Sequence, residues 1–172
     1  MKTHYSKNSD FNALVECLKN ISIEAQRTDN HKLPFKSIAE FVLQYGCAFF
    51  WRKLPRKYDL KNFGSCSECA LELAQKYPDH LIYVEGYTYM PTGHGLPTQY
   101  AWCSDMLRNV YDPARSNANA NSLYYGVPIK LQYAIGLQNK SSKGSIDAWE
   151  VGWPMFYDDP ALFLDDRIPL MY

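Results

Sequence analysis

The chain has 172 residues, 47% of them hydrophobic and 21% charged, which is enough for one globular domain with a core that needs no disulfide or metal staples. Lys and Arg number 18, as do Asp and Glu, and this zero net charge argues against a broad surface for nucleic acid. No run of eighteen apolar residues and no signal peptide is apparent, and the cysteines are five, an odd number. These features predict a cytoplasmic protein with reduced thiols and no membrane segment.

Two amphipathic helices are predicted in the N-terminal third. Apolar residues recur every three or four positions over residues 10–21 and again over about 35–45, where Gly46 supplies a stop signal. The basic stretch that follows the apolar segment 47–51 is interrupted by a proline and is typical of a surface loop. Residues 1–62 are therefore expected to form a helical N-terminal extension.

A third helix is predicted to begin at Cys66. Ser65 and Glu68 have the spacing of a capping box, which makes Ser65 the N-cap and Cys66 the first helical residue. A thiol at this position lies at the positive end of the helix dipole, which favours the thiolate and makes the sulfur a better nucleophile. The helix is expected to end near Tyr77.

Beyond this helix the hydrophobic pattern changes from a helical to a strand-like period. Short runs rich in β-branched and aromatic residues predict strands at residues 81–87, 100–103, 107–111, 124–129 and 131–137. Because helices come first and a mostly antiparallel sheet follows, the fold class is predicted to be α+β. The core is expected over residues 63–137, with a C-terminal segment, 138–172, packing on it in a single domain.

Three further patterns allow other readings. Glu85 lies in an apolar strand and would need a partner if buried, but strand alternation favours its solvent-facing side. Cys66 and Cys69 have the spacing of a redox pair, although the preceding segment is not the strand that such pairs usually follow. A zinc site would need the ligands Cys66, Cys69, His94 and Cys103. The first two lie on an ordinary helix and eight residues separate the last two, so neither a metal nor another cofactor is predicted.

Several short motifs occur in a fixed order between residues 64 and 128. They are Gly64-x-Cys66, Tyr83-Val84-Glu85-Gly86-Tyr87, Ala101-Trp102, Asp112-Pro113 and Tyr125-Gly126-Val127-Pro128. This order resembles a group of small uncharacterised phage and bacterial proteins. The succession of a cysteine-bearing helix, a strand with histidine and a strand with aspartate is similar to the core of papain-like and transglutaminase-like cysteine hydrolases. The resemblance implies that core, with added N-terminal helices.

The resemblance assigns roles to individual residues. Cys66 falls on the nucleophile position and Asp112 on the position of the orienting acid. Two residues depart from the pattern: Tyr100 stands where the base histidine is expected, and Cys69 where the helix usually has asparagine. A phenol with a pKa near ~10 is a poor base at neutral pH. His94, six residues before Tyr100 in a glycine-flanked loop, is the histidine that could fold back to replace it.

Each of these residues also has a purely structural reading. Cys66 can be a small buried residue at a helix end, and Asp112 a turn residue ahead of proline. Tyr100 can be an ordinary strand residue, and His94 an exposed loop residue.

Two functions compete on this evidence. The first is a degenerate cysteine-hydrolase-like protein that binds another protein, as a phage-encoded factor acting on a host target. The missing histidine and the 14 tyrosines favour this reading, because tyrosine is enriched at interfaces. The alternative is an active cysteine-dependent amide hydrolase or acyl transferase. In that reading Cys66 attacks, and backbone N–H groups at the helix start hold the oxyanion.

Overall fold

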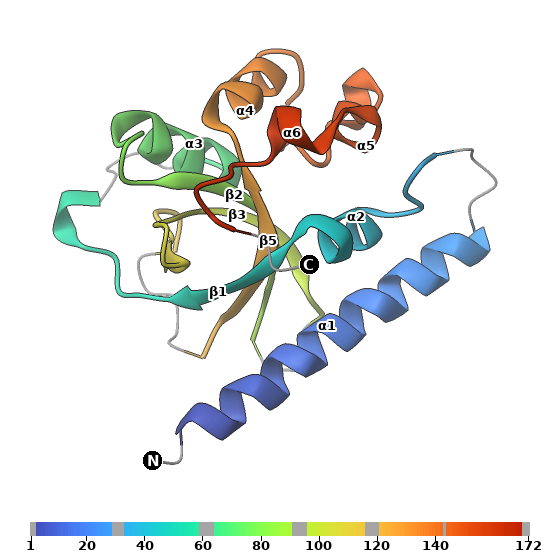
Figure 1. The fold of residues 1–172 in the computed structure, drawn as a ribbon, viewed down its shortest axis with the longest axis horizontal. Helices are drawn as coiled ribbons and strands as arrows, with labels where there is room; N and C mark the ends of the chain where they lie inside the picture. The colour runs from blue at the N-terminus through green and yellow to red at the C-terminus, as the bar shows by residue number, and fades with distance from the viewer. Residues whose placement is uncertain are drawn as a thin grey trace.

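The computed structural model describes residues 3–28, 33–58, 64–90, 96–115, 121–142 and 144–169, with side chains over 10–25 in the first range. Its centre is a closed barrel with the strand order β1-β4-β3-β2-β5, and helices pack around it (Figure 1). The strands are β1 (Cys47–Trp51), β2 (Ile82–Tyr89), β3 (Thr98–Ser104), β4 (Asn109–Tyr111) and β5 (Leu123–Ile129). The helices are α1 (Thr3–Thr28), α2 (Ile38–Tyr45), α3 (Cys66–Lys76), α4 (Leu131–Gln138), α5 (Pro154–Tyr157) and α6 (Pro160–Phe163), with short 3₁₀ turns η1 (Arg56–Tyr58) and η2 (Trp149–Val151). The α+β class is confirmed.

The strand pairing is mostly antiparallel, as predicted. Among the described strands, β1–β4 is the parallel pair, and the pairs β1–β5, β2–β3, β2–β5 and β3–β4 are antiparallel. β1 joins the two edges of the sheet, because it pairs with β5 on one side and with β4 on the other. The N-terminal third therefore contributes a barrel strand as well as two helices, where the sequence predicted helices alone.

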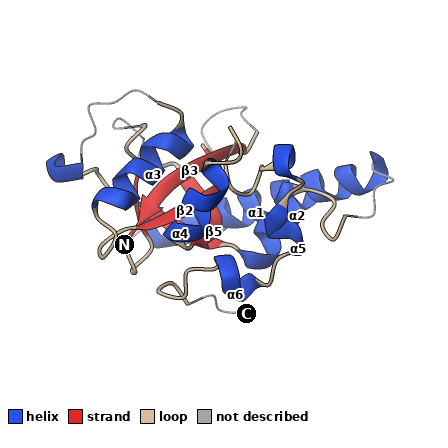
Figure 2. Ribbon diagram, turned by 90° about the horizontal axis from the view of Figure 1, so that it is seen from above, coloured by secondary structure: helices blue, strands red, loops and turns tan. Residues whose placement is uncertain are grey.

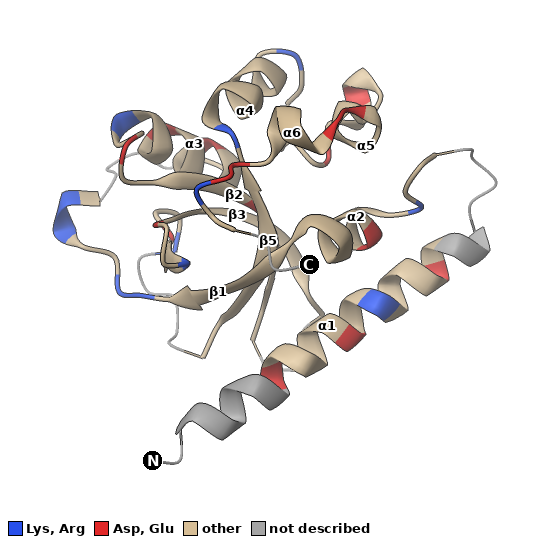
Figure 3. Ribbon diagram, in the orientation of Figure 1, with Lys and Arg blue, Asp and Glu red and all other residues tan. Residues whose placement is uncertain are grey.

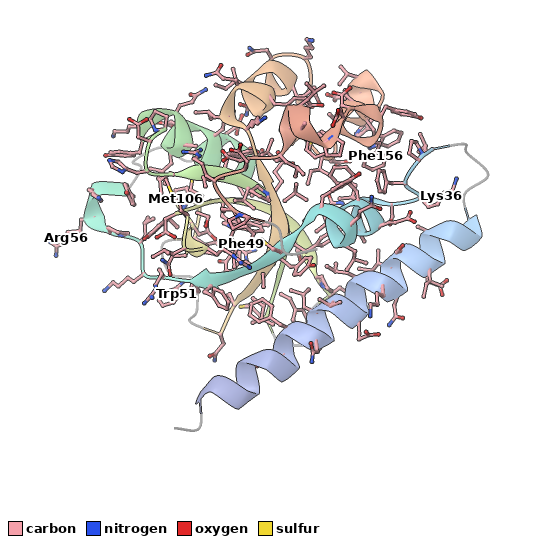
Figure 4. The ribbon with its side chains drawn as sticks, viewed as in Figure 1. Lys36, Phe49, Trp51, Arg56, Met106 and Phe156 are labelled. Carbon is pink, nitrogen blue, oxygen red and sulfur yellow. The ribbon has the colours of Figure 1, made fainter. Side chains whose placement is uncertain are left out.

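Alternate residues of the strands fill the barrel interior. This cluster consists of Phe49, Ile82, Val84, Trp102, Val110 and Tyr124, with Ile168 from the C-terminal segment. The Trp102 ring meets Phe49 and Tyr124 edge to face, with ring centroids 5.5 and 5.1 Å apart (Phe49 is labelled in Figure 4). Gly86 pairs with Gly126 where β2 and β5 approach closely, and a Cβ on either would overlap the opposite backbone. The interior of so small a barrel is a packed core.

The outer face of the barrel is covered by helices (Figure 2). α3 packs on β3 and β2 through Ala70, Leu73 and Ala74, and α1 runs past α2 outside the barrel. β2 is consequently buried on both of its faces from Ile82 to Thr88.

Residues 131–138 form helix α4, so the strand predicted at 131–137 is wrong. Ala134 and Leu137 are buried at the i, i+3 spacing of one helix face. A short apolar run is compatible with either period, and here tertiary packing decided it.

α1 is longer than the predicted helix over residues 10–21. Leu14, Leu18 and Ser22 are buried at intervals of four residues, which places one stripe of the helix against the rest of the protein. In the part of the chain that the structure describes, no helix is both long enough and apolar enough to cross a lipid bilayer. Figure 3 shows both signs of charge spread over helices and loops, with a basic stretch at η1.

Candidate functional site

The predicted capping box at the start of α3 is present, and the helix begins at Cys66. The Ser65 Oγ accepts the Glu68 backbone N–H at 3.3 Å, and the Glu68 carboxylate accepts the Ser65 backbone N–H at 2.8 Å. This reciprocal pair satisfies two N–H groups that a helix start leaves open. It holds Cys66 in the first turn, beside β3.

Cys66 lines a cavity of about 350 Å³ on the outer face of β2 and β3. The lining comes from α2, α3, the two strands and the loop after α4, and comprises Ile38, Cys66, Ser67, Glu85, Gly86, Gln99, Tyr100, Ala101, Gly144, Ile146 and Asp147. Below, this cavity is called the Cys66 pocket. Its size lies at the lower end of the range for small-ligand sites.

Three of the predicted site residues come together at this pocket. Tyr100 lines the pocket with Cys66, and its hydroxyl donates a hydrogen bond to the Asp112 carboxylate at 3.3 Å. Tyr124 donates to the other carboxylate oxygen at 3.0 Å. The backbone N–H groups of Ala114 and Arg115 also donate to Asp112, at 3.1 and 3.0 Å. Asp112 is therefore both the partner of Tyr100 and the turn residue that its place before proline predicted.

Burial raises the pKa of the Cys66 sulfur above its ordinary value, which favours the thiol over the thiolate. Backbone N–H groups of Ala101 and Ser67 lower this pKa, while the Glu85 and Asp112 carboxylates raise it. The thiolate expected from the helix dipole is thus disfavoured, since desolvation outweighs the two backbone donors, Ala101 on β3 and Ser67 at the start of α3.

Tyr100 is neutral as well. Burial raises its pKa well above the ordinary range, and the Asp112 carboxylate raises it further. The guanidinium of Arg115, which lies 4.3 Å from the centre of the Tyr100 ring, lowers this pKa but does not reverse the shift. A protonated phenol that already donates to a carboxylate has no tendency to take a proton from a thiol.

The sequence reading of Glu85 is wrong, because the side chain is buried with 6% of its surface exposed. Its carboxylate accepts hydrogen bonds from the Tyr83 hydroxyl at 2.6 Å and from the backbone N–H groups of Ser145 and Ile146 at 2.5 and 2.9 Å. Gly144 lies so close that a Cβ there would stand 2.7 Å from a carboxylate oxygen. Alternation failed because the loop after α4 covers the face expected to meet solvent. A carboxylate inside a continuous apolar run was the signal for this burial.

The remaining sequence readings have different outcomes. His94 lies outside the described residues. None of the five cysteines is in a disulfide bond, and Cys103 is buried with its sulfur donating to the Ala70 carbonyl oxygen at 3.0 Å. Among the described residues no cluster of three or more His, Cys, Asp or Glu side chains has the arrangement of a metal site.

No family model, curated protein or solved structure matches this chain. The chemistry of the Cys66 pocket is therefore the basis for the functional assignment.

Proposed function

We propose that this protein is a non-catalytic relative of the papain-like and transglutaminase-like cysteine hydrolases that binds a partner protein at the Cys66 pocket. One observation carries the proposal. Tyr100, the residue that the resemblance assigns to the base position, lines the pocket with Cys66, and it is a phenol that donates to Asp112. In this proposal Cys66, Tyr100 and Asp112 correspond to the nucleophile, base and acid, and the residue at the base position is a hydrogen-bond donor.

The protonation states support a binding role. An activated thiol requires a nearby base or a depressed pKa, and burial raises the pKa of Cys66 instead. Among the described side chains the imidazole is that of His80, which lies beyond the C-terminal end of α3, whereas Cys66 begins the helix at its N-terminal end. The 11 residues of that helix span roughly 16 Å, at about 1.5 Å per residue, which is beyond the reach of proton transfer.

Exposed apolar side chains close in sequence to the pocket-lining residues favour a protein as the partner. Met90 ends the β2 side of the β2–β3 hairpin and is 49% exposed, and Leu96 lies just before β3 and is 80% exposed. Trp149, two residues after the pocket residue Asp147, is 51% exposed. Aromatic and apolar side chains of this kind anchor protein interfaces. The resemblance to phage and bacterial proteins makes a host protein the expected partner.

The alternative is an active amide hydrolase or acyl transferase, and one observation favours it. Backbone N–H groups of Ala101 and Ser67 interact with the Cys66 sulfur and oppose the effect of burial on its pKa. N–H donors at a nucleophile are also what an oxyanion hole uses. In this reading His94 would supply the base.

The alkylation rate of Cys66 against pH separates the two functions. Iodoacetamide labelling, followed by mass spectrometry of the Cys66 peptide, should give a midpoint above the ordinary thiol pKa of about 8.5. Free N-acetylcysteine labelled in parallel is the reference. Rapid labelling of Cys66 at pH 6 would overturn the proposal, and its loss in a His94→Ala variant would identify the base.

A second experiment restores the missing group. The parent should not hydrolyse p-nitrophenyl acetate above the rate of its own Cys66→Ser variant, whereas Tyr100→His should gain Cys66-dependent hydrolysis. Hydrolysis by the parent that disappears in Cys66→Ser would show that the protein is an enzyme.

A further inference from the structure

The turn between β3 and β4 presents two adjacent apolar side chains to solvent. Met106 and Leu107 are 52% and 79% exposed, although methionine and leucine are most often buried (Met106 is labelled in Figure 4). The Asp105 carboxylate holds the turn by accepting the backbone N–H groups of Leu107 and Asn109 at 2.9 and 3.0 Å. Arg108 adopts a left-handed φ of 62°, which residues other than glycine seldom do. The apolar pair is therefore displayed by a preordered turn, and binding to it does not have to order a loop first.

A basic segment lies beside this turn. The exposed cations of residues 52–57, which follow β1 and enter η1, are Arg52, Lys53, Arg56 and Lys57 (Figure 3). At the start of the segment the Arg52 Nε donates to the Asn109 Oδ1 at 2.8 Å, and the Asn109 Nδ2 in turn donates to the Asp105 carboxylate at 2.8 Å. Arg52 is therefore fixed next to the turn.

The far end of the basic segment reaches the same turn by another route. The Lys57 Nζ lies 4.6 Å from the centre of the Tyr58 ring, and that ring meets the Tyr111 ring edge to face with centroids 5.3 Å apart. The Tyr111 hydroxyl donates to the Asp105 carboxylate at 3.0 Å. Both ends of the basic segment are thus connected to the turn that displays the apolar pair.

The charge of this surface is one-sided. The four cations of residues 52–57 and the apolar pair, Met106 and Leu107, are below called the Leu107 surface. Neither ion pair between described side chains, Lys19–Glu16 or Arg167–Asp165, involves one of these cations. The carboxylate of the turn already accepts four hydrogen bonds from neighbouring residues. Within the described part of the chain, the cations therefore have no carboxylate partner.

We propose that the Leu107 surface binds an acidic segment of the partner protein, in which carboxylates stand on either side of an apolar side chain. The carboxylates meet the cations, and the apolar side chain covers Met106 and Leu107. None of the six residues lines the Cys66 pocket, so this is a second contact with the partner. That the partner is a protein rests on the proposed function, whereas the chemistry of its segment rests on the surface itself.

The apolar pair and the fixed cations favour a peptide over other anionic ligands. The phosphates of a nucleic acid would satisfy the cations but would leave Met106 and Leu107 against a charged backbone. An anionic bilayer attracts cations without regard to their exact positions. Here Arg52 and Lys57 are held in place by Asn109 and Tyr58, and fixed donors suit discrete carboxylates.

The test compares two labelled peptides of equal length. Fluorescein-labelled Gly-Asp-Glu-Leu-Glu-Asp-Gly and its neutral counterpart Gly-Asn-Gln-Leu-Gln-Asn-Gly are titrated with the protein and followed by fluorescence anisotropy. The acidic peptide should bind at least about tenfold more tightly than the neutral one at low salt. Raising the NaCl concentration from about 0.1 M to about 1 M, which shortens the Debye length from about 10 Å to about 3 Å, should remove most of this preference.

Two pairs of variants locate the binding surface. The double change Lys53→Gln with Arg56→Gln should abolish most of the preference. Its matched control, Lys19→Gln with Lys140→Gln, removes the same charge from exposed positions on α1 and beyond α4 and should preserve it. Leu107→Ser should weaken binding of the acidic peptide about threefold or more. Leu162→Ser, at a 58% exposed position in α6, should leave that affinity unchanged.

Equal affinity of the two peptides, or binding of neither in the millimolar range, would overturn the inference. A preference that both double variants weaken alike would also overturn it, because net charge would then be the cause. Binding to phosphatidylserine vesicles that the Lys53 and Arg56 changes abolish would assign the surface to a membrane, and binding to duplex DNA that Leu107→Ser leaves unchanged would assign it to nucleic acid. Either result would make the acidic segment wrong. None of these changes touches the Cys66 pocket, so the alkylation and hydrolysis tests judge the non-catalytic assignment separately.

Discussion

Replacing Glu85 by alanine should destabilise the protein strongly, because this carboxylate fastens the loop after α4 to β2. Three donors lose their acceptor: the Tyr83 hydroxyl and the backbone N–H groups of Ser145 and Ile146. A buried donor left without an acceptor costs about 1–3 kcal/mol. We take the lower end for each, since Glu85 lines a pocket that admits water.

The expected loss for Glu85→Ala is therefore about 3 kcal/mol in the free energy of unfolding. For a chain of this size it corresponds to a fall of about 6–12 °C in Tm. Glu85→Gln keeps one acceptor oxygen but turns an amide N–H₂ toward a donor, so its loss should be about 1–2 kcal/mol. Urea unfolding followed by tryptophan fluorescence measures both. The matched control is Glu16→Gln, whose exposed pair with Lys19 is worth about 0.2–1 kcal/mol.

Gly144 makes the test of this contact sharper. A Cβ at this residue would stand 2.7 Å from a Glu85 carboxylate oxygen, so Gly144→Ala should be costly in the parent and much less so in Glu85→Ala. The double-mutant cycle should give a coupling of about 1 kcal/mol or more, in the direction of relief. If the effects of the two changes were simply additive, or if Glu85→Ala cost no more than Glu16→Gln, the reasoning about this loop would be refuted.

Three further changes test the fold and the site. Gly86→Ala should destabilise the protein by about 1–3 kcal/mol, since the new Cβ meets the β5 backbone. Gly136→Ala, at an exposed position in α4 with open space around it, should instead stabilise the protein by about 0.5–1 kcal/mol. Thermal melts that ranked the two variants the other way would contradict the barrel packing. Ser65→Ala should lower the free energy of unfolding by about 1 kcal/mol, because α3 loses its N-cap, and Ser65→Asp should retain most of that stability. An unchanged urea midpoint for Ser65→Ala would argue against the capping box. Burial raises the pKa of Asp112 in the folded protein, so its protonation favours folding below the unfolded pKa of about 3.9, and this contribution is lost as the pH rises through the folded pKa. Asparagine at position 112 does not titrate, so the free energy of unfolding of Asp112→Asn should fall below that of the parent by less at pH 6.5 than at pH 3.5. A difference in unfolding free energy between the two proteins that did not change with pH would refute this.

Local features of the chain were predictable because they depend on neighbours in sequence. The capping box at Ser65 and Glu68 is formed by side chains and amides three residues apart, and it is present as predicted. The strands around residues 82–89, 98–104 and 123–129 follow from β-branched and aromatic runs.

Features that depend on packing between distant segments were missed. The run at residues 131–138 suits either a strand or a helix, and burial of Ala134 and Leu137 decided for the helix. β1 closes the barrel through partners about 60 and 80 residues away, which no local pattern reports.

The protonation state of the site was likewise a property of the tertiary structure. The sequence alone determined that Cys66 begins a helix, because local hydrogen bonding between Ser65 and Glu68 is enough for it. Burial of the sulfur and of Glu85 depends on the loop after α4 and on the barrel wall, which come together only in the folded chain. Desolvation acts through that three-dimensional environment, so only the tertiary structure could show that burial raises the pKa of the Cys66 thiol and that Glu85 is a buried residue of the same pocket.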